Sequence, residues 1–521
     1  METVERRRTA SRWPGVLAGV VAAAVLFGTA QLAAAFFGPA AMPLAAVGST
    51  FIDFTPPWLK DFAIATFGTA DKLVLFIAMG VVAALLAGLA GLLARRRWSL
   101  GAGLVVVLSV VIGACVATRS GASALDLVPT VLGTAAGLAA LRLLAGRAAA
   151  ADSAPADGGP ESSQAVGRRR FLASAALLAG AAAVVGAGGS VLSGVRNAAR
   201  AVREALRLPA AASPAAPLPA GVQAPVPGVV DFVTPNPQFY RIDTALIVPE
   251  VDPAGWSLRV HGMVEEEFTL RFQDLLEAEL TEAYVTLTCV SNVVGGDLAG
   301  NAKWLGYPLR QVLARAKPLP GADMVLSTSI DGFSASTPLD VLQDDRDALL
   351  AIGMNGEPLP LEHGFPVRMV VPGLYGYVSA TKWVVDLEVT RFQDKAAYWT
   401  TRGWSARGPV KTASRIEVPR PLARVPAGRV ALGGTAWAQH RGISRVQVQL
   451  DNGGWRDAEL AAEASVDTWR QWFYVWEDAR PGSHQARVRA WDGRGELQTA
   501  EQAPPVPDGA SGWHTLTFTV E

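Results

Sequence analysis

A single cysteine in the second half of the chain stands where a metal ligand could act. Cys289 ends the alternating apolar stretch AYVTLTC and opens a polar, glycine-rich segment, CVSNVVGGDLAGNAKW. Functional side chains concentrate where a strand gives way to a loop, and a thiolate is a soft ligand that suits a redox-active metal. A lone cysteine on a strand also occurs as an inert, small apolar side chain. The residues by themselves leave both interpretations open.

The cysteine count removes several other kinds of chemistry. The chain has 521 residues and two cysteines, Cys115 and Cys289. Cys115 lies in an apolar run, so the polar half cannot form an internal disulfide. Haem attachment through CxxCH and a four-cysteine iron–sulfur cluster both need more thiols. HExxH, GxSxG and P-loop motifs are absent as well, and a formal net charge of zero argues against a nucleic-acid partner.

Several ordered strings between residues 231 and 521 resemble the sulfite-oxidase family of molybdenum enzymes. They are FYRIDTAL, VTLTCVSN, AKWLGYPL, DGFSASTPL, AIGMNGEPLPLEHGFPVRMVVPGLYGYVSATKW and GGTAWAQHRGISRVQVQLDNGGW. The resemblance implies an oxidoreductase that uses molybdenum-molybdopterin. It also implies an α+β molybdopterin-binding catalytic domain at 231–405, followed by an immunoglobulin-like β-sandwich at 406–521 that in the family often mediates dimerisation.

The resemblance also assigns the site. It makes Cys289 the one protein ligand of molybdenum, and it places cations at the phosphate of the pterin, where a planar guanidinium can bind oxygens in pairs. Taken singly, His363 could be a turn residue, Arg368 a strand-edge charge and Lys382 a solvated side chain. The expected cofactor contacts besides the cysteine are Tyr240, Arg241, Asp243, Ser291, Asn292, His363, Arg368, Ser379 and Lys382.

Two positions depart from the family pattern. Val293-Val294 stands where sulfite oxidases carry a pair of arginines, and Phe333 stands where they carry an active-site tyrosine. Arg441 matches a position where some relatives place a substrate-binding arginine, so Phe333 and Arg441 are both expected at the catalytic centre. Fewer cations would hold a small dianion poorly. A larger or neutral substrate is therefore expected, such as an S-oxide, an N-oxide or an organic sulfur compound.

The elements that carry this domain begin with a membrane part. A spanning helix needs about 20 apolar residues, and the sequence has five apolar stretches of about this length. Arginine clusters lie before the first stretch, between the second and third, and between the fourth and fifth. If these clusters are cytoplasmic, the C-terminal half lies outside the cytoplasm. Because only Arg142 is charged within a span, an anchor is favoured over an ion path; docking of a membrane electron carrier is the alternative. The expected all-α bundle, within residues 1–200, has spans near 14–37, 72–94, 99–118, 125–145 and 171–194, with an interfacial helix in 38–71.

The fifth apolar stretch resembles an export signal. Arg168-Arg169-Arg170-Phe171-Leu172 precedes a weakly apolar run, so residues 168–194 are similar to a twin-arginine signal, used by proteins that leave the cytoplasm folded. The expected location is the bacterial cell membrane, with the soluble domains on the extracytoplasmic side. Residues 152–167 and the Pro/Ala-rich segment 201–230 are expected linkers.

Periodicity indicates the elements of the soluble half. WSLRVHGMV and AYVTLTC alternate as strands, LRFQDLLEAEL and LGYPLRQVLARA are typical of helices, and RVQVQLDNGGWRDAEL is typical of a hairpin. Such a mixture followed by strands alone indicates an α+β domain and a β-sandwich.

The partners follow from what the chain lacks. Without a haem or iron–sulfur motif, electrons must pass to an external carrier, either a quinone-linked membrane protein or a cytochrome. A small-molecule substrate, membrane lipid and a homodimer through the C-terminal domain are the other expected partners. Three alternatives remain: an enzyme of the methionine-sulfoxide-reductase type, a catalytically inactive binding or scaffold protein, and a transporter formed by the helices.

Overall fold

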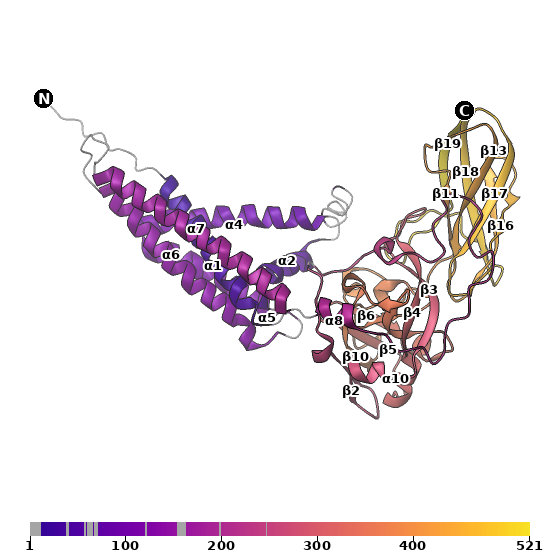
Figure 1. Ribbon diagram of the computed structural model, residues 1–521, viewed down its shortest axis with the longest axis horizontal. Helices are drawn as coiled ribbons and strands as arrows, with labels where there is room; N and C mark the ends of the chain where they lie inside the picture. Colours follow the sequence, from indigo (N-terminus) through magenta and orange to yellow (C-terminus); the bar gives the residue numbers. More distant parts are fainter. Residues whose placement is uncertain are drawn as a thin grey trace. The chain divides into compact units, whose positions relative to one another are not determined.

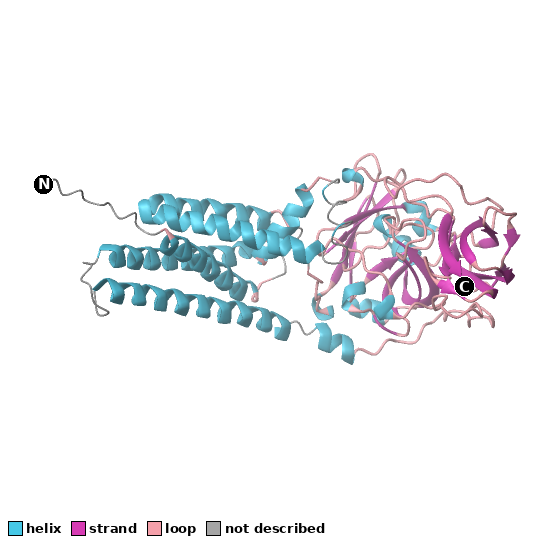
Figure 2. Cartoon of the chain, turned by 90° about the horizontal axis from the view of Figure 1, so that it is seen from above, coloured by secondary structure: helices cyan, strands magenta, loops and turns pink. Residues whose placement is uncertain are grey.

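The computed structural model describes residues 12–37, 41–56, 59, 66, 71–119, 122–153, 163–196, 199–245 and 247–521 (Figure 1). The chain divides into two compact units, Met1–Ala198 with Ala245–Ile247, and Ala199–Thr244 with Val248–Glu521. Figure 2 shows the helices of the first unit in cyan and the strands of the second in magenta.

Within its described residues, the first unit has five helices that are long and apolar enough to cross a membrane, Trp13–Ala34, Leu73–Arg96, Trp98–Ala117, Ala124–Ala150 and Val166–Gly188. The expectation of five such helices is confirmed. Within the interfacial segment expected at 38–71, the structure has a short helix, and most of 57–70 lies outside the described residues. The elements are α1 (Trp13–Ala34), α2 (Pro43–Phe54), α4 (Asp71–Arg96), α5 (Trp98–Ala117), η3 (Ala124–Leu127), α6 (Val128–Ser153) and α7 (Ser163–Arg196).

Small residues let the long helices approach closely. A Cβ atom on Gly19 of α1 would lie 1.9 Å from the carbonyl oxygen of Ala87 in α4, and one on Gly91 would lie 2.0 Å from the carbonyl oxygen of Gly15. Contacts between small residues of this kind drive helix association in lipid, where the hydrophobic effect between helices is lost. The glycine-rich composition of these spans thus serves their packing.

The second unit begins with α8 (Ala199–Ala205) and a long extended segment. Composition predicts a linker at 201–230, but this segment is packed against the unit. Arg203 pairs with Glu357 at 3.1 Å, and Ser213 forms a bridge with Thr281. Ala224, Val226 and Val229 form a buried cluster. Proline disfavours helix and sheet interiors, yet an extended chain still buries its apolar side chains when a partner surface is present.

The middle of the unit combines one mixed and one antiparallel sheet with short helices, as the α+β expectation requires. One sheet has the strand order β2-β1-β10-β5-β6, and the other has β3-β4-β7-β8 with β9 paired to β7. The strands are β1 (Ser257–Gly262), β2 (Phe268–Arg271), β3 (Thr281–Thr288), β4 (Ala299–Pro308), β5 (Met324–Ser329), β6 (Ser334–Pro338), β7 (Leu349–Met354), β8 (Glu357–Pro358), β9 (Arg368–Val370) and β10 (Val384–Thr390). Between them lie α9 (Phe272–Leu276), α10 (Leu309–Ala316) and α11 (Leu339–Gln343).

The predicted elements are mostly present. The strand expected in WSLRVHGMV is β1, whose Leu258 and Val260 are fully buried, and the strand expected in AYVTLTC is β3, which ends one residue before Cys289. The helix expected in LRFQDLLEAEL is only α9, because its first residues pair as β2 with β1. Pairing with the preceding strand thus replaced part of a locally favoured helix.

The C-terminal region consists of two sheets, β11-β13-β17-β16 and β12-β19-β18-β14-β15. One core lies between them, with Leu432 and Trp472 from the first sheet and Val446, Val488 and Phe518 from the second. The expected hairpin is present as β14 paired to β15. The strands are β11 (Ala413–Val418), β12 (Arg424–Val425), β13 (Gly428–Trp437), β14 (Ile443–Leu450), β15 (Arg456–Asp457), β16 (Glu459–Leu460), β17 (Arg470–Ala479), β18 (Gly482–Asp492) and β19 (His514–Val520).

Candidate active site

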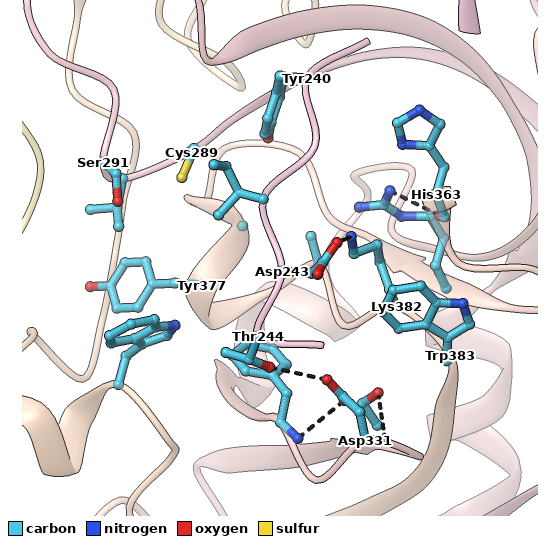
Figure 3. Close-up of a pocket in the computed structure, with 18 of the residues that line it drawn as sticks. Tyr240, Asp243, Thr244, Cys289, Ser291, Asp331, His363, Tyr377, Lys382 and Trp383 are labelled. Carbon is cyan, nitrogen blue, oxygen red and sulfur yellow. Dashed lines mark hydrogen bonds and ion pairs between the residues drawn. The ribbon is translucent and has the colours of Figure 1, made fainter. Parts of the chain in front are cut away.

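A pocket in the second unit collects most of the side chains expected at the site (Figure 3). Four separate stretches of chain line it: 239–244 before β1, 289–291 after β3, 329–333 between β5 and β6, and parts of 363–404 around β9 and β10. The expected residues that line the pocket are Tyr240, Asp243, Cys289, Ser291, Phe333, His363, Arg368 and Lys382.

Cys289 stands directly after the last residue of β3. Its backbone N–H donates to the carbonyl oxygen of Leu298 at 2.9 Å, and its carbonyl oxygen accepts from the N–H of Asn292 at 3.1 Å. The side-chain oxygen of Asn292 accepts from the N–H of Leu298 at 2.9 Å, which closes the loop. Asn292 therefore shapes the turn around the cysteine and does not line the pocket.

The Cys289 thiol is almost buried, at 8% exposure. Burial raises the pKa of this thiol, and hydrogen bonds from Ser291 and the charge of Lys382 oppose that effect only in part. The thiol therefore stays protonated at neutral pH, which makes it a poor free nucleophile. A metal ion would instead displace the proton, since coordinating thiols are deprotonated outright.

A buried ion pair forms one end of the pocket. Lys382 Nζ lies 2.8 Å from Asp243 Oδ2 and donates to the carbonyl oxygen of Glu362 at 3.2 Å. Burial lowers the pKa of Lys382 to about 8, against the opposing effect of Asp243. Arg241 Nε also lies 2.8 Å from Asp243 Oδ2, but its side chain is 38% exposed and does not line the pocket. The Asp243 carboxylate thus forms ion pairs with two cations.

Arg368 carries a second buried charge at this end. It is 5% exposed, and it donates only to backbone carbonyl oxygens, those of Met369 at 3.3 Å and His363 at 3.2 Å. No carboxylate among the described residues forms an ion pair with it. Burial lowers the pKa of Arg368 to about 10, so the guanidinium remains charged at neutral pH. A buried cation of this kind is costly unless an anion pairs with it.

His363 is a neutral member of the same group. Burial, together with the charges of Arg368 and Lys382, lowers the pKa of His363 to about 4. Its Nε2 lies 3.2 Å from the carbonyl oxygen of Asn236, which can only accept, so Nε2 carries the proton. His363 was expected to be among the groups that hold a phosphate, and it lines the pocket without adding a charge.

Aromatic side chains form the other part of the lining. Trp404 lies between Tyr377 and Trp399, with ring centroids 5.8 and 6.1 Å apart, and Tyr398 continues the row from Trp399 to Phe333. In Figure 3, Tyr377 and Ser291 lie on the opposite side of the view from His363 and Lys382. Trp399 and Trp404 both line the pocket. The dense aromatic string YWTTRGW was the signal available in the sequence.

Two further pocket residues were not anticipated. Thr244 Oγ1 donates to Asp331 Oδ2 at 3.1 Å, and Asp331 Oδ1 accepts from the N–H of Phe333 at 3.3 Å. These bonds, drawn as dashed lines in Figure 3, fasten the loop that carries Phe333 to the segment that carries Asp243. No motif in the sequence pairs residues so far apart.

Some expected site residues lie elsewhere. Arg441 pairs with Asp492 at 2.8 Å and donates to the oxygens of Val410 and Thr412, so its side chain is engaged outside the pocket lining. Ser379 is fully buried and donates to the carbonyl oxygen of Tyr375 at 3.0 Å, a turn contact. Val293 is 57% exposed and outside the lining too. In each case local hydrogen bonding or a surface turn decides the placement.

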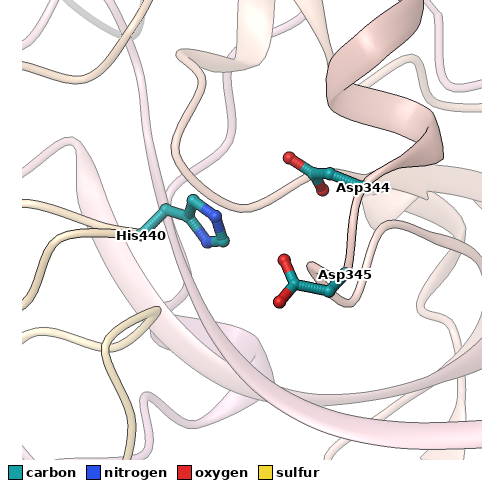
Figure 4. Close-up of side chains that lie close together, drawn as sticks. All are labelled: Asp344, Asp345 and His440. Carbon is teal, nitrogen blue, oxygen red and sulfur yellow. The ribbon is translucent and has the colours of Figure 1, made fainter.

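A second group of titratable side chains lies away from the pocket. Ligand atoms of Asp344, Asp345 and His440 lie within 4.8 Å of one another (Figure 4). Arg346 Nη2 already lies 2.6 Å from Asp344 Oδ2, and His440 Nδ1 lies 3.3 Å from Asp467 Oδ1. These partners make the group an ion-pair network that joins the α11–β7 loop to the β13–β14 turn.

The pocket fits a cofactor that brings both a metal and a phosphate. Cys289 offers a protonated thiol that a metal would convert to a ligand, and Arg368 offers a buried charge that lacks an anion. Arg368 and Lys382 together carry two positive charges against the one carboxylate that Lys382 shares with Arg241. This donor set matches the chemistry of molybdopterin, with its metal and its phosphate.

Comparison with known proteins agrees with this geometry. Residues 245–399 match the model of the oxidoreductase molybdopterin binding domain. Mitochondrial sulfite oxidase from Mus musculus is 31% identical over 288 residues, 46% of this chain and 52% of that protein. The oxidoreductase YuiH from Bacillus subtilis is 32% identical over 157 residues, 30% of this chain and 76% of that protein. The sulfane dehydrogenase SoxCD from Paracoccus pantotrophus aligns with a TM-score of 0.49 and 25% identity, over 56% of this chain and 83% of that one.

The similarity covers only part of each protein. The chain spans about half the length of the mammalian sulfite oxidases it matches, and the membrane unit lies outside the matched domain. The matched domain contains Cys289, Arg368 and Lys382 of the pocket, whereas the lining segment 239–244 and Trp404 lie outside residues 245–399. This chain therefore belongs to the sulfite-oxidase-like family of molybdopterin-dependent oxidoreductases.

Proposed function

We propose that the protein is a membrane-anchored, extracytoplasmic molybdenum oxidoreductase that transfers an oxygen atom to or from a small sulfur- or nitrogen-containing organic substrate. The observation that carries this proposal is the presence of Cys289 in the same pocket as the buried cations Arg368 and Lys382. A thiol and an anion site in one cavity suit one ligand that has both a soft metal and a phosphate.

Each pocket group has a distinct task in this proposal. When bound, the cofactor supplies a metal centre that changes oxidation state by two electrons. Cys289 ligates that metal, Arg368 and Lys382 hold the phosphate, and neutral His363 packs against Phe239 with ring centroids 5.5 Å apart. The remaining lining orients the substrate and excludes water, which strengthens every electrostatic interaction inside the pocket.

The aromatic lining supports an organic substrate over sulfite. The charged cations that line the pocket are Arg368 and Lys382, and both belong to the phosphate-binding end. The other part offers Phe333, Tyr377 and the row that contains Trp404. Aromatic rings stabilise apolar groups by burial, whereas a small dianion needs cationic donors. Phe333 stands where sulfite oxidases carry a tyrosine and has no hydroxyl to donate to an anion, which also favours an organic substrate over sulfite.

The five apolar helices support the proposed anchor. Arginine clusters at their ends favour a bacterial membrane location with the catalytic part outside, and the twin-arginine-like segment at 168–194 supports export of the folded, cofactor-loaded protein. Electrons would pass to an external carrier, a quinone-linked membrane protein or a cytochrome. The C-terminal sheets, which we assign to an immunoglobulin-like domain at 406–521, are the proposed dimer contact.

Metal content tests the proposal directly. The full chain would be produced in a host that makes the cofactor and purified in mild detergent. It should contain about one molybdenum atom and one pterin per protein chain. Cys289→Ser should lose activity and retain less metal while remaining folded. Cys115→Ser, a change of the buried thiol in α5, is the matched control and should behave as wild type.

A substrate panel separates the alternatives. S-oxides, including peptide methionine sulfoxide, N-oxides and sulfite would each be added to the reduced or oxidised protein, and the molybdenum signal followed. Turnover of an organic S-oxide or N-oxide, with little for sulfite, is the expected result. A loaded protein that responds to no substrate would favour the scaffold alternative, and full activity of Cys289→Ser would overturn the site.

A further inference from the structure

The strand that carries Cys289 lies at the edge of its sheet. In the order β3-β4-β7-β8, β3 has a strand partner on one side only. An edge strand leaves a row of backbone N–H and C=O groups unpaired, and these must find other partners when they are buried. In this protein the partners come from distant parts of the chain. The N–H of Glu282 donates to the carbonyl oxygen of Ser213 at 2.8 Å near the start of the strand.

Two turns of the C-terminal region satisfy the other end of β3. The N–H of Thr286 donates to the carbonyl oxygen of Asp467 at 3.0 Å, and the N–H of Trp469 donates to Thr286 Oγ1 at 2.8 Å. Gln439 Nε2 then donates to the carbonyl oxygen of Thr286 at 3.0 Å and to Thr288 Oγ1 at 2.9 Å. The C-terminal region therefore holds both the backbone and a side chain of this strand end.

Thr288 is the residue before Cys289, so Gln439 acts one residue from the thiol. On the loop side, Cys289 is fixed by the bonds to Leu298 and Asn292. On the strand side, the bond from Gln439 to Thr288 Oγ1 fixes the rotamer of that threonine. The backbone that aims the thiol is thus held from both sides, and one of the two supports belongs to the C-terminal region.

Gln439 occupies this position at an energetic cost. Its side chain is 1% exposed, and its Oε1 has no hydrogen-bond partner among the residues that the structure describes. A buried acceptor without a partner is unfavourable, and packing alone would be served equally well by an apolar side chain of the same length. The amide is useful because its N–H₂ group supplies two donors to two acceptors on the same strand.

We propose that Gln439 is a positioning residue for the metal-binding thiolate, through which the C-terminal region sets the orientation of Cys289. This inference rests on the proposed function, in which Cys289 ligates molybdenum. It gives the C-terminal region a task within its own chain, in addition to any contact with a second copy. Gln439 acts through Thr288 and touches neither the substrate nor the cofactor in this role.

The test compares Gln439→Met with Gln498→Met in the full-length, cofactor-loaded protein. Gln498 is also a buried glutamine of the C-terminal region, at 3% exposure, and its bonds stay within that region, to Ser414, Ala490 and Gly512. We expect Gln439→Met to shift the g-values of the molybdenum(V) paramagnetic signal. Backbone hydrogen exchange across residues 286–289 should also rise about tenfold or more, because the variant loses both hydrogen bonds that Gln439 donates to this strand end. Gln498→Met should lower the melting temperature and leave the signal and this exchange unchanged.

Thr288 provides a second, independent test. Thr288→Ser keeps the hydroxyl acceptor and should retain the wild-type signal, whereas Thr288→Val should shift the signal in the same direction as Gln439→Met, because it removes one of the two bonds that Gln439 makes. The double variant should show no shift beyond that of Gln439→Met, because the bond between Gln439 and Thr288 is already lost in that variant. A wild-type signal and wild-type exchange in Gln439→Met, or in Thr288→Val if Gln439→Met fails to fold, would overturn the inference. Wild-type protein without molybdenum would contradict the proposed function instead, and the exchange measurement would still report on Gln439.

Discussion

Lys382 and Asp243 form an ion pair inside the pocket, with 2.8 Å between Nζ and Oδ2 and side-chain exposures of 10% and 3%. Asp243 also accepts from Arg241, while Arg368 has no carboxylate partner among the described residues. The pocket is therefore more positive than its own carboxylates can balance. Buried charge of this kind is unfavourable in the cofactor-free protein and favourable once an anion is bound. Replacing a buried cation by a neutral residue should therefore stabilise the cofactor-free protein and weaken anion binding.

Arg368→Gln should show this reversal. The neutral variant removes a buried charge, so the cofactor-free protein should be as stable as wild type or more stable. Binding of the phosphate should weaken by about 2 kcal/mol, roughly thirtyfold, the usual value of a charge-assisted hydrogen bond. Melting temperature without cofactor and molybdenum retention during dialysis check the two arms. A large loss of stability in the cofactor-free variant would contradict the assignment of Arg368 to an anion.

We expect the protonation of Lys382 to make anion binding depend on pH. Burial lowers the pKa of Lys382 to about 8, so the side chain is charged below that pH and loses its charge above it. An anion favours the charged form, and its affinity should be highest below about pH 8 and fall above it, by up to tenfold per unit. Calorimetry with sulfate, whose charge is constant over this range, measures the fall on cofactor-free protein.

Lys382→Arg is the control for that titration. Arginine keeps its charge throughout the range, so the affinity for sulfate should remain nearly flat between about pH 7 and about pH 9. An equally steep fall in this variant would assign the titration to another group.

We expect Trp404 to contribute to the binding of organic substrates. Its ring lies in the row between Tyr377 and Trp399, and it lines the pocket. Trp404→Ala should raise KM for organic S-oxides or N-oxides about tenfold or more, with a smaller effect on kcat, because burial of aromatic surface stabilises the bound substrate. Trp455→Ala removes a tryptophan of the C-terminal region that packs on Trp513, and it serves as the matched control. Equal effects of the two changes on KM would remove the substrate role of Trp404.

We expect the pair of His440 and Asp467 to make a pH-dependent contribution to the stability of the folded protein. Its hydrogen bond to Asp467 raises the pKa of His440, and Asp344 adds to that effect. The protonated form is therefore favoured in the folded state. The resulting stability is fully present below the unfolded pKa and is lost as pH rises through the higher folded pKa. Because the pair is partly exposed, the contribution should be at most about 1 kcal/mol.

The measurement is the difference in melting temperature between wild type and His440→Gln as a function of pH. This difference should be largest near about pH 5.5 and should vanish at alkaline pH, once His440 is neutral in both folded and unfolded states. A constant difference across the range would show that His440 acts through packing and not through its charge.

Local pattern determined much of the protein. Continuous apolar runs of sufficient length specify the membrane helices, because crossing a bilayer depends on length and composition. Alternation specified β1 and β3, and thereby placed Cys289 at a strand end. The family strings assigned Arg368, Lys382 and Asp243 to the cofactor, and the three side chains line one pocket.

Tertiary structure decided what depends on contacts between distant residues. Arg441 matches a substrate-binding position, but Asp492 at 2.8 Å and two oxygen acceptors engage it elsewhere. Trp399 and Trp404 line the pocket because the chain after β10 folds back over Phe333 and Tyr377. Gln439 reaches Thr288 across 151 positions of sequence. Periodicity reports which face of an element is buried, but it carries no record of the partner that buries it, and hydrogen-bond partners far apart in sequence are chosen only when the sheets assemble.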